Sequence, residues 1–397
     1  MENARVTLAW LTDIMKSYDG TEQRISLRSV PRYSVSYLYT AFDSSIGAYF
    51  DVTTHRAQSQ KLMLPLWQHC LHMPSAMAAK DNILTLQEPM DLFYFLHAPY
   101  VAFWKNVTEW NVYGINRLQI KDGYGQLVLS DVLTEAWPVG TPFFPVTWAY
   151  LADESEKTYF AAHIRDIEIN YEVLTSYFAD LPAAIWQPEQ TKYLRTYRDR
   201  DLWLYPPAWA NDLKESVKRN STRLDNQSGF FTFDRHTTQP ERSREFDYVL
   251  LNRQEIRDFI RFLFRCRGRA VPFWYPSWTA DFELIGDAAT GESVLTVSSS
   301  EYSKSYNTGG SKKNIILFMK NGTILPLEVA GYLTGLPGEG GRILLKSQLA
   351  MPVRRSEVKM ISLLNLWRLD NDAVTLQYET SLTATTSLPL MDVTREV

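Results

Sequence analysis

The stretch "REFDYVLLNRQEIRDFIRFLFR" (residues 244–265) decides how this chain is expected to fold. Every second residue from Phe246 to Leu250 is apolar, which is the period of a strand with one buried face. From Asn252 onward the apolar residues follow helical spacing, and Glu255 lies three residues after Asn252, as in a capping box. A strand followed directly by an amphipathic helix is therefore expected. The buried stripe of that helix would be Ile256, Phe259, Ile260 and Leu263.

An earlier part of the chain follows the same order. "RISLRSVPRYSVSYLY" (residues 24–39) alternates at its end, with Val35, Tyr37 and Tyr39 on one face. "DSSIGAYFDVTTHRAQ" (residues 43–58) then shows helical spacing behind a serine in the place of an N-cap. The apolar face of this helix would contain Ile46, Tyr49, Phe50 and Thr53.

Six short segments of the first half match segments of the second half in the same order. They are "AWLTDI" (9–14) with "AWANDL" (208–213), "LPLW" (64–67) with "VPFW" (271–274), "NILTL" (82–86) with "SVLTV" (293–297), "VAFWKN" (101–106) with "ILFMKN" (316–321), "GQLVL" (125–129) with "GRILL" (341–345), and "INYEV" (169–173) with "LQYET" (376–380). Two units of this length are too few and too long for a solenoid. They indicate two tandem copies of one domain.

The duplication predicts four parts of the chain. Residues 1–173 form a first β-rich repeat, and residues 209–380 form a second one. Residues 174–208 between them contain four prolines and several aromatic residues, so we expect an ordered linker that packs against a neighbour rather than a flexible one. Residues 381–397 resemble an extended arm that adds to the surface of a neighbouring subunit.

The rest of each copy has the pattern of strands and turns. Asn321-Gly322 lies between two apolar runs, and this dipeptide is typical of a hairpin with a type I′ turn. Only one convincing helix is visible in each copy. The expected fold class is therefore mainly β, largely antiparallel, with one flanking helix per domain.

Composition excludes several classes of protein. The net charge of −4 argues against a basic nucleic-acid-binding protein, and two cysteines in 397 residues exclude a disulfide framework. The N-terminal residues show no signal-peptide pattern, and no apolar run approaches the ~18–20 residues of a membrane span. We therefore expect a protein that assembles in a reducing cytoplasm and has no membrane anchor.

The motifs that could carry chemistry are weak. His69, Cys70 and His72 could ligate a metal, but no second Cys/His pair follows them at zinc spacing. The glycine-rich segments 122–126 and 335–341 each precede a strand pattern rather than a helix, so they do not resemble phosphate-binding loops. Carboxylates such as Asp51 and Glu168 have no spacing that pairs them. The sequence thus predicts no catalytic residue, no cofactor and no metal, and a protein that is not an enzyme.

A basic and aromatic cluster follows the second predicted helix. Arginines there alternate with aromatic residues, an arrangement that can stack single-stranded nucleic acid, but the acidic net charge and the absence of such a cluster from the first copy argue against that use. A subunit contact is favoured instead. The candidate interface residues are Arg265, Arg267, Arg269, Phe273, Trp274 and Trp278.

This cluster also carries a family resemblance. "FLFRCRGRAVPFWYPSWTADF" (residues 262–282) resembles a segment shared by the distal-tail and minor tail proteins of long-tailed bacteriophages and gene transfer agents. In that segment an amphipathic helix leads into an Arg-Gly-Arg turn, an aromatic strand and a Trp/Asp-Phe ending. The match covers about forty residues of the second copy and lacks the Arg-Gly-Arg turn in the first copy.

The resemblance implies a structural role. Proteins of this family are tail-tip or baseplate components of the virion that form a ring, continue the tail tube and attach tip proteins or fibres. Their domains are tail-tube-like β-sandwiches or barrels with a flanking helix. The implied partners are the chain itself, the tail tube protein, hub or tip proteins and tail fibres, and the genome would pass through the ring without sequence-specific binding. The implied location is the tail tip of the virion, after assembly in the host bacterial cytoplasm.

Two domains in one chain suggest a stoichiometry. A trimer would present six similar domains and would match a six-fold tube above and a three-fold tip below, whereas a hexamer is the competing geometry. An alternative function is receptor or carbohydrate binding by the same particle. That function needs exposed aromatic residues gathered in one groove, and the candidates are Trp104, Trp110, Tyr113 and Trp137.

Overall fold

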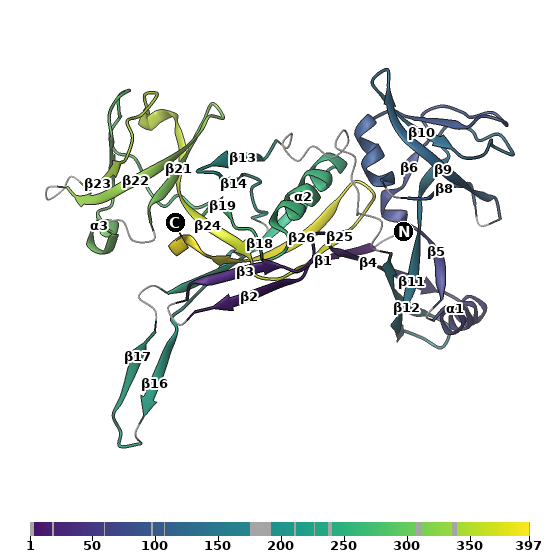
Figure 1. Ribbon diagram of the computed structural model, residues 1–397, viewed down its shortest axis with the longest axis horizontal. Coiled ribbons are helices and arrows are strands. Elements are labelled where there is room, and N and C mark those ends of the chain that lie inside the picture. The colour runs from purple at the N-terminus through teal and green to yellow at the C-terminus, as the bar shows by residue number, and fades with distance from the viewer. Residues whose placement is uncertain are drawn as a thin grey trace.

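The computed structural model describes residues 4–17, 20–58, 60–96, 98–106, 108–174, 192–209, 212–225, 227–236, 240–306, 312–335 and 340–396. These residues form a mainly β structure in which nearly all strand pairs are antiparallel. We call residues 4–174 the first half and residues 192–396 the second half. Figure 1 shows an outer lobe of strands at each end of the molecule, with helix α2 between the lobes above a central layer of strands.

Most helices and strands of the first half recur in the same order in the second half. The first half contains β1 (Ala4–Ala9), β2 (Thr12–Lys16), β3 (Glu22–Ser26), β4 (Arg32–Ala41), α1 (Ser44–Ala57), β5 (Lys61–Pro65), β6 (Leu71–His72), β7 (Ile83–Leu86), β8 (Tyr100–Trp104), β9 (Trp110–Lys121), β10 (Tyr124–Leu129), β11 (Pro142–Tyr159) and β12 (Arg165–Val173), with 3-10 turns η1 (Trp67–His69) and η2 (Pro89–Phe95). Residues before the second series form β13 (Leu194–Tyr197) and β14 (Arg200–Trp203). The second half continues with β15 (Lys214–Lys218), β16 (Ser221–Asp225), β17 (Phe231–Arg235), β18 (Glu241–Leu250), α2 (Arg253–Cys266), β19 (Phe273–Pro276), β20 (Val294–Val297), α3 (Glu301–Tyr306), β21 (Asn314–Met319), β22 (Ile324–Thr334), β23 (Gly341–Leu345), β24 (Val358–Leu369), β25 (Ala373–Tyr378) and β26 (Ala384–Asp392), with η5 (Arg355–Glu357) and η6 (Thr394–Glu396).

The strand and helix expected at residues 244–265 are confirmed. β18 is followed directly by α2, and the side chain of Asn252 caps the helix by accepting a hydrogen bond from the Glu255 N–H at 2.9 Å. The expected apolar stripe is buried, because this face of α2 packs on β18 and β19. The carboxylate of Glu255 in turn accepts from the N–H of Leu251, one residue before the cap.

The helix expected at residues 43–58 also forms, but two details differ. Its N-cap is Asp43, whose carboxylate accepts from the N–H groups of Ser45 and Ile46, rather than a serine. The expected apolar face is turned largely outward, because Ile46 and Tyr49 are exposed while Gly47 and Thr54 are buried. A helix with the right period can thus present its apolar residues to solvent.

The same strand pairings occur in both halves. Nine pairs of the first half have counterparts in the second half: β1–β4 with β15–β18, β2–β3 with β16–β17, β4–β12 with β18–β26, β5–β11 with β19–β24, β7–β10 with β20–β23, β8–β9 with β21–β22, β8–β11 with β21–β24, β9–β10 with β22–β23, and β11–β12 with β24–β26. From β1 to β4, each residue corresponds to the second-half residue whose number is higher by 209. At β12 this difference in numbering has grown to 219. Small insertions between strands account for the growth.

Irregular features recur along with the pairings. The ladder between β9 and β10 skips one residue between Ile115 and Arg117, and the ladder between β22 and β23 skips the corresponding residue between Val329 and Gly331. The left-handed backbone of Lys80 (φ 78°) recurs at Gly291 (φ 88°). Isolated bridges recur too: Met77 pairs with Trp137, and Ala288 pairs with Val353.

The pairings correct several of the sequence matches. The matches of 82–86 with 293–297 and of 125–129 with 341–345 are in register with the ladders. The match of 101–106 with 316–321 is displaced by one residue. The other three matches are out of register. Residues of β1 correspond to β15 rather than to the segment 208–213, and "LPLW" (64–67) corresponds to "YPSW" (275–278). β12 corresponds to β26 rather than to β25. Isolated identities, such as the Ala-Trp pair shared by residues 9–10 and 208–209, do not mark corresponding positions.

The hairpin expected at Asn321-Gly322 is confirmed, but its turn type is not. β21 and β22 are antiparallel, and the N–H of Met319 donates to the carbonyl of Thr323 at 2.9 Å. Only Gly322 has a positive φ (86°), whereas a type I′ turn needs positive φ at both central residues. The connection is therefore longer than two residues, with Gly322 in the left-handed position.

The described parts of the linker and of the C-terminal arm lie in sheets. β14 pairs in parallel with β19 through Leu202 and Trp274, and Trp203 is fully buried. Residues 175–191 of the expected linker lie outside the described residues. β26, in the expected arm, pairs along its length with β18 and at its end with β24, so it is a central strand of the second half.

β25 corresponds to the end of β11 in the first half, and it joins the two halves. It pairs with β1 over six residues, from Ala4 opposite Tyr378 to Ala9 opposite Ala373. It meets its own neighbour β26 only at Gln377 and Tyr378. The central layer therefore runs without interruption from the second half into the first.

Candidate functional site

The candidate interface residues divide into a surface group and a core group. The guanidinium of Arg265 donates two hydrogen bonds to the carboxylate of Asp201, at 2.5 and 2.6 Å. Arg267 is exposed beside it. Together they line an open groove whose other polar residues are Ser29 of the first half and residues 198–201 at the turn into β14 and its start.

The Arg-Gly-Arg turn connects the two halves of the chain. Arg267 ends α2 in a left-handed conformation, with φ 49° and ψ 50°. Gly268 follows with φ +65°, and a Cβ there would overlap the carboxylate of Asp372 and the side chain of Trp10. The N–H of Arg269 donates to Asp372 at 2.9 Å, and its guanidinium donates to the carbonyl of Thr12 at 3.0 Å. The turn therefore binds to both halves inside the chain.

The three aromatic candidates lie deeper. Phe273 and Trp274 are buried by the chain itself, so a second chain could meet neither of them. The expectation of an interface role for these two residues is corrected on that ground: β19, which contains them, is an internal strand between β24 and β14. Trp278 is half-buried and stacks on Phe318, with ring centroids 5.1 Å apart.

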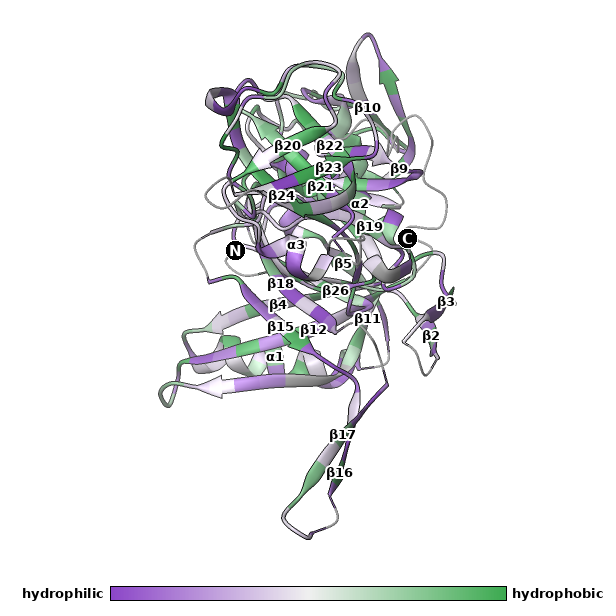
Figure 2. Cartoon of the chain, turned by 90° about the vertical axis from the view of Figure 1, so that its left-hand side faces the viewer, coloured by the Kyte–Doolittle hydropathy of each residue, from purple (hydrophilic) through white to green (hydrophobic). Residues whose placement is uncertain are grey.

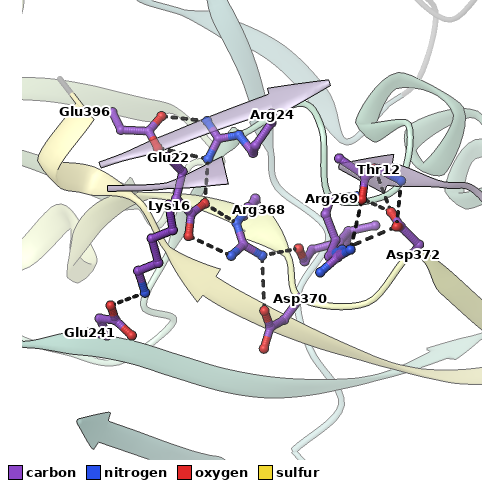
Figure 3. A network of polar contacts seen from close by, with 11 residues as sticks. Thr12, Lys16, Glu22, Arg24, Glu241, Arg269, Arg368, Asp370, Asp372 and Glu396 are labelled. Atoms are coloured by element: carbon purple, nitrogen blue, oxygen red, sulfur yellow. Dashed lines mark hydrogen bonds and ion pairs between the residues drawn. The ribbon is translucent and has the colours of Figure 1, made fainter. Parts of the chain in front are cut away.

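A buried ion network lies where hairpin β2–β3 crosses the second half (Figure 3). The carboxylate of Glu22 on β3 accepts two hydrogen bonds from Arg368 on β24, at 2.8 and 3.0 Å. Arg24 donates to Glu396 at 2.6 and 2.9 Å, and Lys16 pairs with Glu241. Only 3% of the Glu22 side chain and 6% of the Arg368 side chain are exposed. Each charge is matched at the site, as burial requires.

The electrostatics of this network stabilise the charged forms. Burial raises the pKa of Glu22, but the hydrogen bonds and charge of Arg368, together with Arg24 and Lys16, outweigh burial and hold that pKa below its usual value. Asp372 behaves in the same way. Burial raises its pKa, while hydrogen bonds from Arg269 and Thr12 lower it further than burial raises it.

Helix α2 makes the other part of the contact between the halves. Arg253 donates to Asp91 of η2 at 3.0 Å, and its guanidinium lies 4.2 Å from the ring centroid of Tyr94. The hydroxyl of Tyr94 donates to the carbonyl of Arg253 at 2.8 Å. We use the name junction for this contact between the halves: the β1–β25 ladder, the crossing of hairpin β2–β3, and the packing of α2 on η2.

The possible metal ligands at residues 69–72 are separated by burial. His69 is buried against Tyr94, with ring centroids 4.6 Å apart, whereas His72 is exposed. Burial, and then the charge of Arg253, hold the pKa of His69 well below its usual value. Across the described ranges, no three His, Cys, Asp or Glu side chains are placed to hold a metal ion together. None of the helices in those ranges is both long and apolar enough to cross a membrane.

The aromatic residues proposed for a sugar-binding groove do not share a surface. Trp137 and Tyr113 are buried in the outer lobe of the first half, and their rings pack against Phe103. Trp110 is exposed and Trp104 is half-buried. Two of the four residues are therefore core residues, and the groove that they would line is not formed.

The sequence did not reveal the residues of the junction. Glu22 and Arg368 are 346 residues apart in the chain, and Thr12 and Asp372 are 360 residues apart. The one local signal was the Arg-Gly-Arg turn, whose glycine indicates a close approach of other atoms. No model of a known protein family matches the chain, and no curated protein sequence matches it either.

Proposed function

We propose that this chain is a structural virion protein of a phage tail tip or baseplate, and that it forms a ring that continues the tail tube and attaches tip proteins or fibres. The proposal combines two lines of support. One is the resemblance of residues 262–282 to distal-tail and minor tail proteins. The other, which carries the proposal, is the recurrence of nine strand pairings within one chain.

The recurrence supports a description of the chain as two copies of one β domain. Each copy has a flanking helix of the same length, α1 and α2, after a strand of the same length, β4 and β18. We propose tail-tube-like sandwich or barrel domains at residues 1–173 and 209–380, and the strand pairings extend the second domain through β26. A ring built of such domains needs no catalytic residue, cofactor or metal.

Two similar domains per chain favour a trimer in this proposal. Three chains would supply six domains to a six-fold tube and would keep three-fold symmetry toward the tip. The partners would be the tail tube protein on one side and hub, tip or fibre proteins on the other. The genome would pass through the lumen without sequence-specific contacts, in a virion assembled in the host bacterial cytoplasm.

The experiment is to determine the mass of the assembled chain and its position in the particle. We expect native mass spectrometry to find three chains per ring, and electron microscopy of intact particles to locate the ring at the end of the tail tube. Six chains per ring would contradict the trimer. Absence of the chain from purified particles would contradict the proposed function itself.

A further inference from the structure

The junction uses different surfaces of the two halves, and each of these surfaces has a counterpart on the other half. The first half contributes β1, hairpin β2–β3 and η2. The counterparts of β1 and of the hairpin in the second half are β15 and hairpin β16–β17. The second half contributes β25, the end of β24, and α2. Their counterparts in the first half are the end of β11, from residue 152 to Tyr159, the residues of β11 just before it, and α1.

The surfaces inside the junction are more buried than their counterparts. β1 alternates between buried residues and exposed or half-buried ones, but all five residues of β15 are exposed. Among the described strands, β15 pairs with β18 alone, so its outer edge is open where the outer edge of β1 is covered by β25. Residues 152–159 of β11 likewise pair with β12 alone in the described part of the chain.

Hairpin β16–β17 stands clear of the rest of the chain in both views (Figure 1, Figure 2). Its aromatic side chains are exposed to 84% at Phe230, 55% at Phe231 and 54% at Phe233. A projecting hairpin with three exposed phenylalanines is costly in water, which indicates that a partner covers it. Hairpin β2–β3, its counterpart, is covered by the second half through the Glu22 and Arg368 network.

The counterpart residues on the two open surfaces are complementary. In the junction, Lys16 of the hairpin pairs with Glu241 at the start of β18. The residue of β16 that takes the place of Lys16 is Asp225, and the residue of β4 that takes the place of Glu241 is Arg32. The ion pair would therefore re-form with its signs reversed.

A second replacement changes the buried ion pair into an aromatic contact. Phe231 takes the place of Glu22 in the hairpin. Tyr150 on β11 takes the place of Arg368 on β24, and it is exposed. Both members of the pair change character together, from charged to aromatic, which preserves the match between the two surfaces.

The strand edges follow the same rule, and the helices differ in exposure. In the β1–β25 ladder, Val6 lies opposite Leu376, and the corresponding residues are Glu215 on β15 and Lys157 on β11, an acid opposite a base. On α2, Asp258 and Arg261 are buried beside η2. On α1 their places are taken by Tyr49 and Val52, which are exposed and apolar.

We propose that a second copy of this chain binds head to tail, with β15 and hairpin β16–β17 of one copy seated on α1, Arg32, Tyr150 and the end of β11 of the next. This contact repeats the junction between copies. The β15 edge adds to residues 154–159 of β11 in the register of β1 with β25, so that Ser216 lies opposite Glu156. A heterologous contact of this kind closes into a ring when a whole number of the rotations between neighbouring copies adds up to about 360°. The inference rests on the two-copy arrangement and the self-association proposed above, and not on the place of the ring in a virion.

The first experiment uses two complementary variants. One variant, Asp225→Arg with Phe231→Ser and Phe233→Ser, disables the hairpin surface. The other, Arg32→Asp with Tyr49→Ser and Tyr150→Ser, disables the receiving surface. All six side chains are exposed or lie at the surface, so both variants should fold, and circular dichroism and thermal melting check that they do.

We expect each variant alone to sediment as a monomer at a concentration at which the wild type assembles. A mixture of the two should form a 1:1 dimer and nothing larger, because each still has one intact surface. Val139→Ser and Leu333→Ser change exposed apolar residues of the outer lobes and should assemble as the wild type does. Variants that assemble like the wild type, or a mixture that stays monomeric, would overturn the inference.

The second experiment tests the register. Oxidation of the chain with Ser216→Cys and Glu156→Cys should link copies covalently, and the largest closed product on a denaturing gel counts the copies in the ring. Ser216→Cys with Lys157→Cys is the control, since a slip of one residue moves the side chain to the opposite face and should reduce linking at least tenfold. Equal linking in both pairs would overturn the proposed register. If the variants form the expected dimer while the chain is absent from purified virions, that result would contradict the proposed function but not this inference.

Discussion

The hairpins β2–β3 and β16–β17 have the same length, the same register and opposite surroundings. The first lies against the second half and exchanges charges with it, and the second projects from the molecule with exposed phenylalanines. The fold of a hairpin is thus set by its own ladder and turn, while its surface residues reflect what covers it. The same contrast separates β1 from β15 and α2 from α1. Comparison of counterpart positions therefore separates residues that stabilise the chain from residues that we propose to serve association.

The largest expected effect comes from the buried ion pair. Glu22→Ala leaves Arg368 buried with one carboxylate fewer, and loss of one partner of a buried pair costs about 3–5 kcal/mol. Phe231→Ala at the counterpart position should change the stability of the isolated chain by less than about 0.5 kcal/mol, because the side chain is exposed. Urea denaturation of both variants measures the difference. Equal losses would show that the two hairpins are not in different surroundings.

The next effect concerns Gly268. Gly268→Ala adds a Cβ at positive φ that overlaps Asp372 and Trp10, so we expect a loss of about 2–4 kcal/mol, composed of left-handed strain and displaced contacts. Gly140→Ala is the matched control. Gly140 also has a positive φ (80°), but no atom lies within 4 Å of its added Cβ, so only the backbone penalty of about 1 kcal/mol applies. If the Gly268 variant is no less stable than the Gly140 variant, the Arg-Gly-Arg turn does not stabilise the junction.

A smaller effect is expected at the helix caps. Asn252→Ala removes the acceptor for the Glu255 N–H and should cost about 1 kcal/mol. Asp43→Ala removes the cap of α1 and should destabilise the isolated chain less, because α1 is mostly exposed while α2 anchors the contact with η2. Thermal melting of both variants ranks the two losses. The opposite ranking would mean that α1 contributes more to the fold than its burial indicates.

The smallest effect is a dependence on pH. The pKa of Asp372 is lowered in the folded chain, so the stability that its charge provides is present above the ordinary pKa of an aspartate, about 4, and is lost as the pH falls through the folded value. Asp372→Asn removes this contribution. We expect the denaturation midpoint of the wild type to fall more steeply than that of the variant as the pH is lowered below about 4. Parallel curves would contradict a role of the Asp372 charge in the junction.

Much of the local structure could be predicted from the sequence. The alternation at residues 244–250 and the helical spacing after Asn252 gave β18 and α2, because these patterns depend on neighbours in the chain. Two of the repeat matches, β7 with β20 and β10 with β23, were in register, because turns and ladders restrict the residue types at these strands. The match of residues 169–173 with residues 376–380 failed because β25, the counterpart of the end of β11, lies beside β26, the true counterpart of β12.

The junction could not be predicted for a different reason. Arg269 is a candidate for a contact between subunits by its sequence, yet it binds Asp372 and Thr12 of its own chain. Phe273 and Trp274 have the composition of an interface, but β19 lies between two other strands. Aromatic and arginine residues serve cores, domain contacts and subunit contacts alike, so residue type alone does not distinguish them.

The pairing of β1 with β25 also sets the order in which the molecule can be completed during its synthesis. β1 leaves the ribosome long before β25, the strand that covers its outer edge and ends at Tyr378. At about 5–20 residues per second, the edge of β1 remains uncovered for roughly 20–70 seconds on every nascent chain. An open strand edge can pair with other chains, and neighbouring ribosomes on one messenger present many such edges at once. The first half of this protein therefore depends on a strand made much later for protection against premature pairing.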